Sequence, residues 1–299
     1  MNKLKTIFVA VATLFITTNI NAQSKNIFYV DQLKNKITQL VDTFPAEVGV
    51  AFSIEGETFE THNNLHFPVM DVAKFYQAIA ICNKLNNNNL SVFNTVQISD
   101  SDLDENTWSP MLEVCQAGDK ISIDKLLEYS LVQGDNNASD ILFGKVADIE
   151  YTDNFINSIA KDACFLETDQ KTLHRDNVLC YDNWTNPVSA VKILEYFYKN
   201  HRKDNYKYVW NFMAKSTIGE NRIPKYIKDY ATIIHGTGTG IFTQNGKTDI
   251  VAVNDVACVV LPNGRYFCLA VFVKDAQCSV SRCEELIATI AQKCFEYFD

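Results

Sequence analysis

Hydrophobic and polar positions near the N-terminus predict a helix followed by a β-hairpin. Four apolar residues recur at helical spacing: Leu33, Ile37, Leu40 and Val41. This spacing predicts an amphipathic helix. A β-branched and aromatic run over 48–54 is closed by Glu55-Gly56 and followed by a second strand-like run over 58–61. Two such runs around a short turn predict a hairpin.

The pattern changes along the chain from Asp71 to about Asn200, where strand signals vanish. Helical periodicity takes their place, and polar loops rich in Asn and Asp separate the periodic segments. The predicted helices cover 74–85, 122–131, 137–146 and 187–198. We therefore expect a long helical insertion after the first hairpin.

Strand signals return after Asp229, and a helix closes the chain. The predicted strands cover 231–235, 249–261 with a break near Asn254, and 265–273. Pro262-Asn263-Gly264 predicts a tight turn between the last two strands. Apolar residues at helical spacing then mark a final helix: Ile287, Ile290 and Cys294.

Together these elements predict an α/β (α+β) protein in which both ends of the chain contribute to one antiparallel sheet. N- and C-terminal helices flank the sheet, and the middle of the chain forms an all-helical lobe. We place the α/β lobe at about 23–66 and 215–299 and the helical lobe at about 67–214. The cleft between two such lobes is where a ligand site is expected.

The first 22 residues have the order of a secretory signal peptide. Lys3 and Lys5 precede an apolar stretch over 7–16, and Ala22 offers a cleavage point. A short N-terminal helix of the mature protein is the less favoured interpretation. We expect a periplasmic or secreted protein that begins at about Gln23. No later segment reaches the roughly 18 apolar residues of a membrane helix.

The net charge and the cysteine spacing of the mature chain disfavour some classes of ligand and partner. Without Lys3 and Lys5, the 27 basic residues become 25 against 36 acidic ones, which gives a formal net charge of −11. Such a charge disfavours nucleic-acid binding. The nine cysteines include no spacing typical of a zinc site, so we expect no metal and no cofactor. Cys278 and Cys283 are close enough in sequence to bridge a turn, and we expect a monomer.

Three segments occur in the order of the motifs S-x-x-K, S-D-N and K-T-G. They are Asp71-Val72-Ala73-Lys74, Gly134-Asp135-Asn136 and Gly236-Thr237-Gly238. Framing segments over 107–111, 173–184, 219–222 and 254–257 extend the match. The chain thus resembles the class A β-lactamases and their penicillin-binding relatives, in particular the branch from Bacteroides-type bacteria. The resemblance covers essentially the whole mature chain.

The resemblance also implies that several catalytic positions carry other residues. Asp71 stands at the position of the nucleophilic serine, and Gly134 at that of the proton-relay serine. Gly236 stands where the lysine of K-T-G belongs. Gln170 falls at the position of the general-base glutamate if the loop length is unchanged, and Glu167 is the only nearby carboxylate of that type.

Other site residues match the family pattern. Lys74 and Asn136 stand at catalytic positions, and Thr237 and Thr239 at substrate-binding positions. Arg222 matches an arginine that helps to bind the substrate carboxylate. Trp108 is expected either as an aromatic wall of the cleft or as a packed loop anchor.

Two structural interpretations follow for these residues. A buried lysine without a partner is costly, so we expect an ion pair between Lys74 and Asp71. For Asp135 and Asn136 we expect helix capping and hydrogen bonding between the lobes.

Because nucleophile, relay, cation and base positions all differ, we expect a catalytically impaired or inactive homologue that keeps a cleft for a ligand or partner. Two alternatives stay open. The chain is a working hydrolase for a β-lactam or another amide or ester with rearranged catalytic groups, or it is a periplasmic module that binds peptidoglycan or a partner protein. The ligands implied are β-lactams or peptidoglycan-like small molecules.

Overall fold

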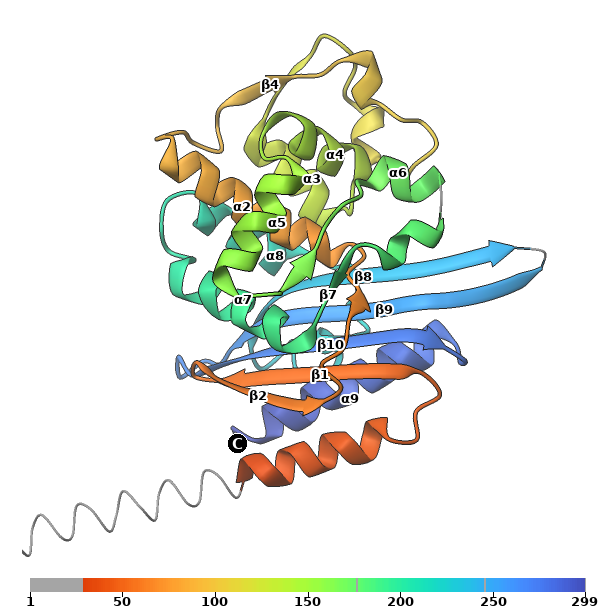
Figure 1. Cartoon of the computed structure of the whole chain (residues 1–299). Helices are drawn as coiled ribbons and strands as arrows, with labels where there is room; N and C mark the ends of the chain where they lie inside the picture. The colour runs from red at the N-terminus through yellow and green to blue at the C-terminus, as the bar shows by residue number, and fades with distance from the viewer. Residues whose placement is uncertain (1–28, 176, 245, 299) are drawn as a thin grey trace, which may run out of the picture.

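The computed structural model describes residues 29–175, 177–244 and 246–298 (Figure 1). The predicted signal peptide, residues 1–22, lies outside the described residues. The lobe boundaries proposed from the sequence remain predictions.

A five-stranded antiparallel sheet forms the centre of the molecule (Figure 1). Its strands run in the order β2-β1-β10-β9-β8. They are β1 (Glu47–Ile54), β2 (Glu57–His62), β8 (Thr232–Gln244), β9 (Lys247–Val260) and β10 (Tyr266–Ala276). The prediction that both ends of the chain share one antiparallel sheet is confirmed. Glu55 and Gly56, with φ of 50° and 95°, form the predicted turn between β1 and β2.

The expected break near Asn254 in the strand predicted over 249–261 is wrong, because β9 is continuous through this residue. Asn254 lies within β9, opposite Phe272 of β10 and Gly238 of β8. Its amide group donates a hydrogen bond of 2.7 Å to the backbone oxygen of Pro68. The buried amide donor thus has a protein acceptor, whereas the side-chain oxygen of Asn254 has no hydrogen-bond partner among the described residues.

Helices cover both faces of the sheet (Figure 1). The final helix α9 (Val280–Glu296) and a helix over 29–41 lie on one side, as predicted. The other side carries α2 (Val72–Asn87), α3 (Ile123–Val132), α4 (Asn136–Lys145), α5 (Ile149–Ile159), α6 (Gln170–Arg175), α7 (Pro187–Asn200) and α8 (Tyr206–Lys215). Four of these seven helices were predicted, whereas α5, α6 and α8 were not.

The expectation that strands vanish between Asp71 and Asn200 is also corrected. Four strands of two or three residues lie there, and a fifth immediately precedes them: β4 (Thr95–Gln97), β5 (Lys120–Ser122), β6 (Cys164–Phe165), β7 (Trp184–Thr185) and β3 (Phe67–Pro68). Such strands are too short for a two-residue period to be recognised. Single 3-10 turns complete the chain: η1 (Asp100–Asp102), η2 (Pro110–Glu113), η3 (Asn177–Tyr181) and η4 (Ile223–Tyr226).

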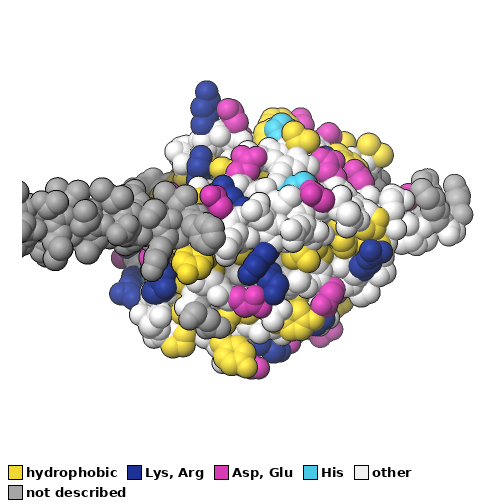
Figure 2. Space-filling model, turned by 90° about the horizontal axis from the view of Figure 1, so that it is seen from below, with side chains coloured by type: hydrophobic (Ala, Val, Ile, Leu, Met, Phe, Trp, Pro, Cys, Tyr) yellow, Lys and Arg dark blue, Asp and Glu magenta, His cyan; other side chains and the backbone are white. Residues whose placement is uncertain are grey.

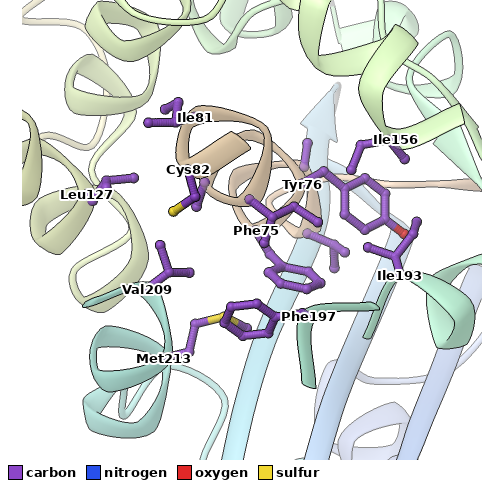
Figure 3. Packing of buried hydrophobic residues seen from close by; sticks show 14 of the residues in the cluster. Phe75, Tyr76, Ile81, Cys82, Leu127, Ile156, Ile193, Phe197, Val209 and Met213 are labelled. Carbon is purple, nitrogen blue, oxygen red and sulfur yellow. The ribbon is translucent and has the colours of Figure 1, made fainter. Parts of the chain in front are cut away.

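The helix α2 passes through the larger hydrophobic core. Phe75 and Tyr76 are fully buried, and Phe75 packs edge-on against Phe197 of α7 (Figure 3). A second core lies between the opposite face of the sheet and the helices at the two chain ends. Because α2 is packed on all sides, the residues at its N-terminal end are held on a rigid element.

The face of the molecule that carries the two terminal helices has basic and acidic side chains interspersed (Figure 2). Among the described residues, no helix is both long and apolar enough to cross a membrane.

Candidate active site

The N-terminal end of α2 places Asp71 and Lys74 one helical turn apart. Asp71 is the residue that precedes the helix, and Met70 before it has φ of 50°. A left-handed conformation is uncommon for a residue other than glycine and often marks a functional site. Here the turn directs Asp71 to the start of a helix, where unpaired backbone N–H groups favour negative charge.

The ammonium group of Lys74 lies 3.0 Å from the Asp71 carboxylate, which confirms the predicted ion pair. It also donates hydrogen bonds of 2.7 Å each to the backbone oxygen of Gly134 and to Oδ1 of Asn136. Only 3% of the Lys74 side chain is exposed, against 42% of Asp71. The cation is therefore fixed by three acceptors, while the carboxylate remains open to solvent.

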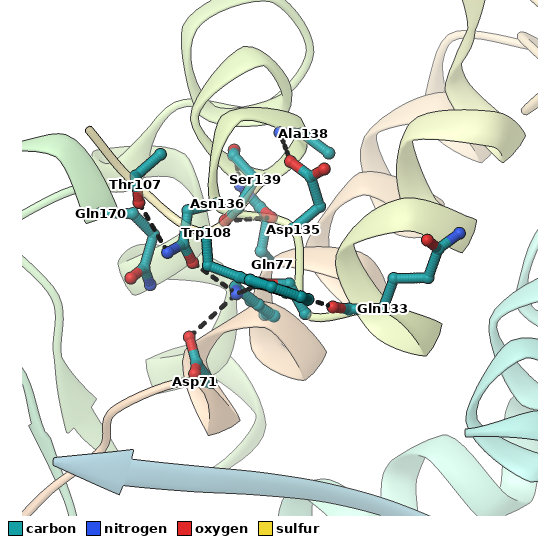
Figure 4. Close-up of polar contacts among 12 residues, drawn as sticks. Asp71, Gln77, Thr107, Trp108, Gln133, Asp135, Asn136, Ala138, Ser139 and Gln170 are labelled. Atoms are coloured by element: carbon teal, nitrogen blue, oxygen red, sulfur yellow. Dashed lines mark hydrogen bonds and ion pairs between the residues drawn. The ribbon is translucent and has the colours of Figure 1, made fainter. Parts of the chain in front are cut away.

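The segment 134–136 joins α3 to α4 and carries the acceptors of Lys74. Asp135 caps α4, since its Oδ1 accepts a 2.8 Å hydrogen bond from the Ala138 N–H (Figure 4). Its carboxylate also accepts hydrogen bonds from the Ser109 hydroxyl and the Met111 N–H. The predicted capping role is confirmed, and Gly134 adopts φ of 69° just before the cap.

Trp108 lies beside this segment and is 66% exposed. Its indole N–H donates a 2.8 Å hydrogen bond to the backbone oxygen of Gln133 (Figure 4). The hydrogen bond fits the expected role of a loop anchor, and the alternative role as an aromatic wall of the cleft stays a prediction.

The strand β8 forms the opposite wall of the site with Gly236 and Thr237, and Thr239 lies two residues further along the strand. Arg222 reaches this strand from the far side and donates a 2.5 Å hydrogen bond to the Thr239 hydroxyl. Its guanidinium also contacts the backbone oxygens of Gly238 and Asn254 and the carboxylate of Glu284. Arg222 is buried, so in this structure it supports β8 from behind.

Most of the predicted catalytic positions line one small pocket of about 40 Å³. The predicted residues in its wall are Asp71, Lys74, Gly134, Gly236 and Thr237. Ser130, Ser216, Ile218 and His235 complete its polar and apolar lining together with Phe75 and Leu131. A pocket of this size accommodates water molecules or one functional group of a substrate.

Gln170, the first residue of α6, is buried and is held through its backbone. Its N–H and that of Lys171 each donate a 2.9 Å hydrogen bond to the carboxylate of Asp140. Burial and the nearby Asp169 raise the pKa of Asp140 to about 7, against the opposing effect of these hydrogen bonds and of Lys74. Figure 4 places Gln170 in the same cluster as Asn136 and Asp71.

Two ionisable residues near the site, Asp140 and His235, are not among the site residues predicted from the sequence. Asp140 occupies the same face of α4 as Asn136, one turn later, which is the only signal in the sequence. His235 Nδ1 lies 3.2 Å from Asp255. Burial alone would lower the pKa of His235, but Asp255 and the backbone oxygen of Ser216 leave it above the ordinary value.

Among the described residues, no group of three or more His, Cys, Asp or Glu side chains is arranged to hold a metal ion.

Comparisons with known proteins identify relatives over nearly the whole chain. The Beta-lactamase enzyme family matches residues 32–298. A β-lactamase of Phocaeicola vulgatus is 33% identical over 95% of this chain and 90% of its own length. The β-lactamase VEB-1 of Pseudomonas aeruginosa is 30% identical over 100% of this chain and 99% of its own length.

The solved structures that this chain resembles are also β-lactamases. The TLA-3 extended-spectrum β-lactamase is 31% identical, with a TM-score of 0.83 over 90% of this chain and 98% of that one. A class A β-lactamase from Bacteroides cellulosilyticus is 26% identical, also with a TM-score of 0.83, over 90% of this chain and 97% of that one.

These relatives overturn the expectation of a catalytically impaired or inactive homologue. The proteins that align along the full length of the chain are β-lactamases, and they favour the alternative of a working hydrolase. In the structure, Lys74 is hydrogen-bonded to Asn136 and paired with the accessible carboxylate of Asp71, and Lys74 and Asp71 line one pocket. The chain belongs to the β-lactamase enzyme family, and its fold is that of the class A enzymes.

Proposed function

We propose that this protein hydrolyses β-lactams, or a related amide or ester, with Asp71 and Lys74 as its central catalytic pair. The observation that carries the proposal is the contact of 3.0 Å between a buried ammonium group and a carboxylate open to solvent. Both groups lie at the end of a rigid buried helix and in the wall of one pocket. Preorganised charge of this kind is a large contribution to hydrolytic catalysis.

In this proposal Asp71 acts as a general base on water. Direct attack by its carboxylate on an amide would give a mixed anhydride, a high-energy product. A water molecule at Asp71 can instead transfer one proton to the carboxylate while its oxygen adds to the substrate carbonyl carbon. The C–N or C–O bond of the tetrahedral intermediate then breaks, and the proton held by Asp71 passes to the leaving nitrogen or oxygen. The net reaction consumes one water and regenerates Asp71.

Lys74 supplies the positive charge beside the carbonyl oxygen as negative charge develops on it. Its ammonium is held by Gly134 and Asn136, so little reorganisation is needed during the reaction. The start of α2 adds its helix dipole in the same place. For Trp108, Thr237 and Thr239 we propose the substrate-binding roles that the sequence suggests, and for Arg222 the support of Thr239.

Hydrolysis of a chromogenic cephalosporin and of a panel of β-lactams and activated esters tests the proposal. We expect saturable turnover by the pure protein. Asp71→Asn and Lys74→Met should each lower kcat by about 100-fold or more, since general-base and electrostatic groups contribute on that order. Glu128→Gln, which breaks an exposed ion pair with Lys125 on α3, is the control and should keep full activity.

The result is decisive in either direction. Absence of turnover on the whole panel, or equal turnover by wild type and Asp71→Asn, would show that Asp71 and Lys74 do not form a hydrolytic pair. Circular dichroism of each variant separates loss of chemistry from loss of folding.

A single turnover in water enriched in oxygen-18 tests for a nucleophilic Asp71 whose anhydride is hydrolysed at the Asp71 carbon. A general base leaves the label only in the product. A nucleophile would form an anhydride, and its hydrolysis at the Asp71 carbon would place the label in the Asp71 carboxylate. Mass spectrometry of the peptide that contains Asp71 should find no label.

For the setting of this activity, we propose that the protein is exported and acts as a monomer. Sequencing of the mature N-terminus should begin at about Gln23, and light scattering of the purified protein should give the mass of one chain. A retained N-terminus or a stable dimer would contradict these two proposals.

A further inference from the structure

Two cysteines flank the start of α9. Cys278 comes immediately before the capping residue Ser279, and Cys283 is the fourth residue of the helix. Side chains at these two positions commonly pack together and fix the direction in which the chain enters a helix. Here the sulfur atoms of the two thiols lie 3.7 Å apart. The sequence showed only that Cys278 and Cys283 are close enough to bridge a turn. The geometry of the helix start explains why their sulfur atoms lie close together.

We propose that Cys278 and Cys283 are a thiol–disulfide modification site that closes a covalent bond across the start of α9. The oxidant is a small disulfide such as glutathione disulfide, or a disulfide-bonded oxidoreductase. One thiolate attacks the external disulfide, forms a mixed disulfide and releases one thiol. The second cysteine then displaces the remaining thiol. Overall, two cysteine thiols are oxidised and one external disulfide is reduced to two thiols.

The burial of the two thiols sets the order of these steps. Cys278 is half-buried and reaches solvent, whereas Cys283 is fully buried. Burial and the neighbouring Cys278 raise the pKa of the Cys283 thiol to about 12. Cys278 is therefore the residue that attacks, and Cys283 the one that resolves the mixed disulfide slowly.

A second pair of thiols provides a natural comparison. Cys258 and Cys268 face each other on β9 and β10, and their sulfur atoms are 3.5 Å apart. Both are fully buried in the core, and burial raises the pKa of Cys268 far above its ordinary value. Two pairs with similar separation thus differ in access, and we expect only Cys278–Cys283 to react in the folded protein.

The position of the pair connects it to the candidate active site. Glu284 follows Cys283 and holds the guanidinium of Arg222 at 3.3 Å. Arg222 in turn donates to Thr239 on the strand that lines the site. A bond between Cys278 and Cys283 would restrain the first turn of α9, directly before Glu284, and so the contact through which Arg222 supports β8.

The experiment counts thiols in the full chain. Reduced protein is incubated with glutathione disulfide, unfolded in an alkylating reagent and weighed intact. Of the nine cysteines in the sequence, we expect seven to be alkylated after oxidation and nine after reduction. Peptide mapping should join Cys278 to Cys283. Cys283→Ser should stop at a mixed disulfide of glutathione with Cys278, and Cys278→Ser should keep all of its remaining thiols free.

Cys115→Ser is the matched control, since Cys115 is another cysteine of intermediate exposure, and it should form the same bond as the wild type. Nine alkylated cysteines after oxidation, a cross-link between other residues, or glutathione that stays on Cys278 in the wild type would each overturn the proposal. Thermal unfolding before and after oxidation reports the restraint: the melting temperature should rise in the wild type and stay unchanged in Cys278→Ser.

Discussion

Gly238 allows β8 to approach the start of α2. A Cβ atom at this position would lie 2.8 Å from Cβ of Met70 and 3.1 Å from the backbone nitrogen of Asp71. These contacts involve backbone and the first side-chain atom, so neither can move aside without shifting the strand. The close approach keeps Asp71 and Thr237 in the wall of one pocket.

We therefore predict that Gly238→Ala lowers the free energy of unfolding by about 1–3 kcal/mol, the usual cost of overpacking, and lowers any hydrolytic rate. Gly144→Ala is the control: it lies in α4 with no atom within 4 Å of its Cβ position. Alanine is the better helix former, so this variant should gain about 0.5 kcal/mol. Urea unfolding measures both. Equal effects of the two substitutions would show that the contact at Gly238 is unimportant.

At the scale of single residues, the sequence could predict contacts that follow from local helix geometry. It could not predict properties that depend on the folded surroundings of a side chain, such as its pKa. Asp71 and Lys74 are three residues apart at a helix start, so their ion pair follows from helical spacing. The raised pKa of Asp140 depends on burial beneath α6 and on Asp169, which are distant along the chain. Such a shift has no local sequence signature.

Helix α4 depends on a buried cap. Asp135 is fully buried and accepts three hydrogen bonds, from Ala138 N–H, Ser109 hydroxyl and Met111 N–H. Asp148 caps the next helix, α5, through one hydrogen bond from Tyr151 N–H, and its side chain is exposed. The Asp148 carboxylate also lies 3.9 Å from the ammonium group of Lys84, a solvent-accessible ion pair. Asp148 thus accepts one backbone hydrogen bond at α5, whereas Asp135 accepts three hydrogen bonds in a buried setting at α4.

We predict that Asp135→Ala costs about 3–4 kcal/mol, because it removes a cap and leaves buried donors unpaired. Asp148→Ala should cost about 1 kcal/mol, the usual value of an exposed cap. Chemical denaturation of both variants gives the comparison. Similar losses would mean that the loop contacts of Asp135 contribute nothing to stability.

At the scale of elements, most of the long segments were predicted, whereas α5 and α8, of 11 and 10 residues, and all the strands of two or three residues were missed. The strands β1 and β10 and the helices α2 and α7 are rich in apolar residues over eight or more positions, whereas β2 contains one apolar residue, Phe59, and was predicted from its place after the Glu55-Gly56 turn. The strand pair β3–β7 has only two residues in each strand. Its existence depends on a partner more than 100 residues away, so the local sequence cannot specify it.

Across the whole molecule, two kinds of ionisable group change the free energy of unfolding in opposite directions as pH rises. Burial disfavours ionisation of Glu47 and Asp102, but hydrogen bonds together with Lys274 and Lys145 leave the pKa of each below its ordinary value. Their stabilisation is present above the pKa of the unfolded chain, near 4, and is lost as pH falls through the lower folded value.

Asp140 and His235 act in the other direction. The pKa of Asp140 is raised to about 7, so the unfolded chain releases this proton at lower pH than the folded protein, and stability falls as pH rises from about 4 to 7. His235 has a pKa above 6.5, and Arg222 is the cation that opposes its charge while Asp255 favours it. Its contribution is full below pH 6.5 and is lost as pH rises through the folded value.

These signs predict that the protein is most stable in mildly acidic solution and loses stability toward about pH 8. Urea unfolding across that range should give a falling free energy for the wild type. In Asp140→Asn the fall below pH 7 should be smaller, and in His235→Gln the fall above pH 6.5 should be smaller. The two variants act on separate parts of the curve, so each assignment is tested alone. A free energy of unfolding that rises steadily from about pH 5 to 8 would contradict both assignments, because only groups with lowered pKa values produce that slope.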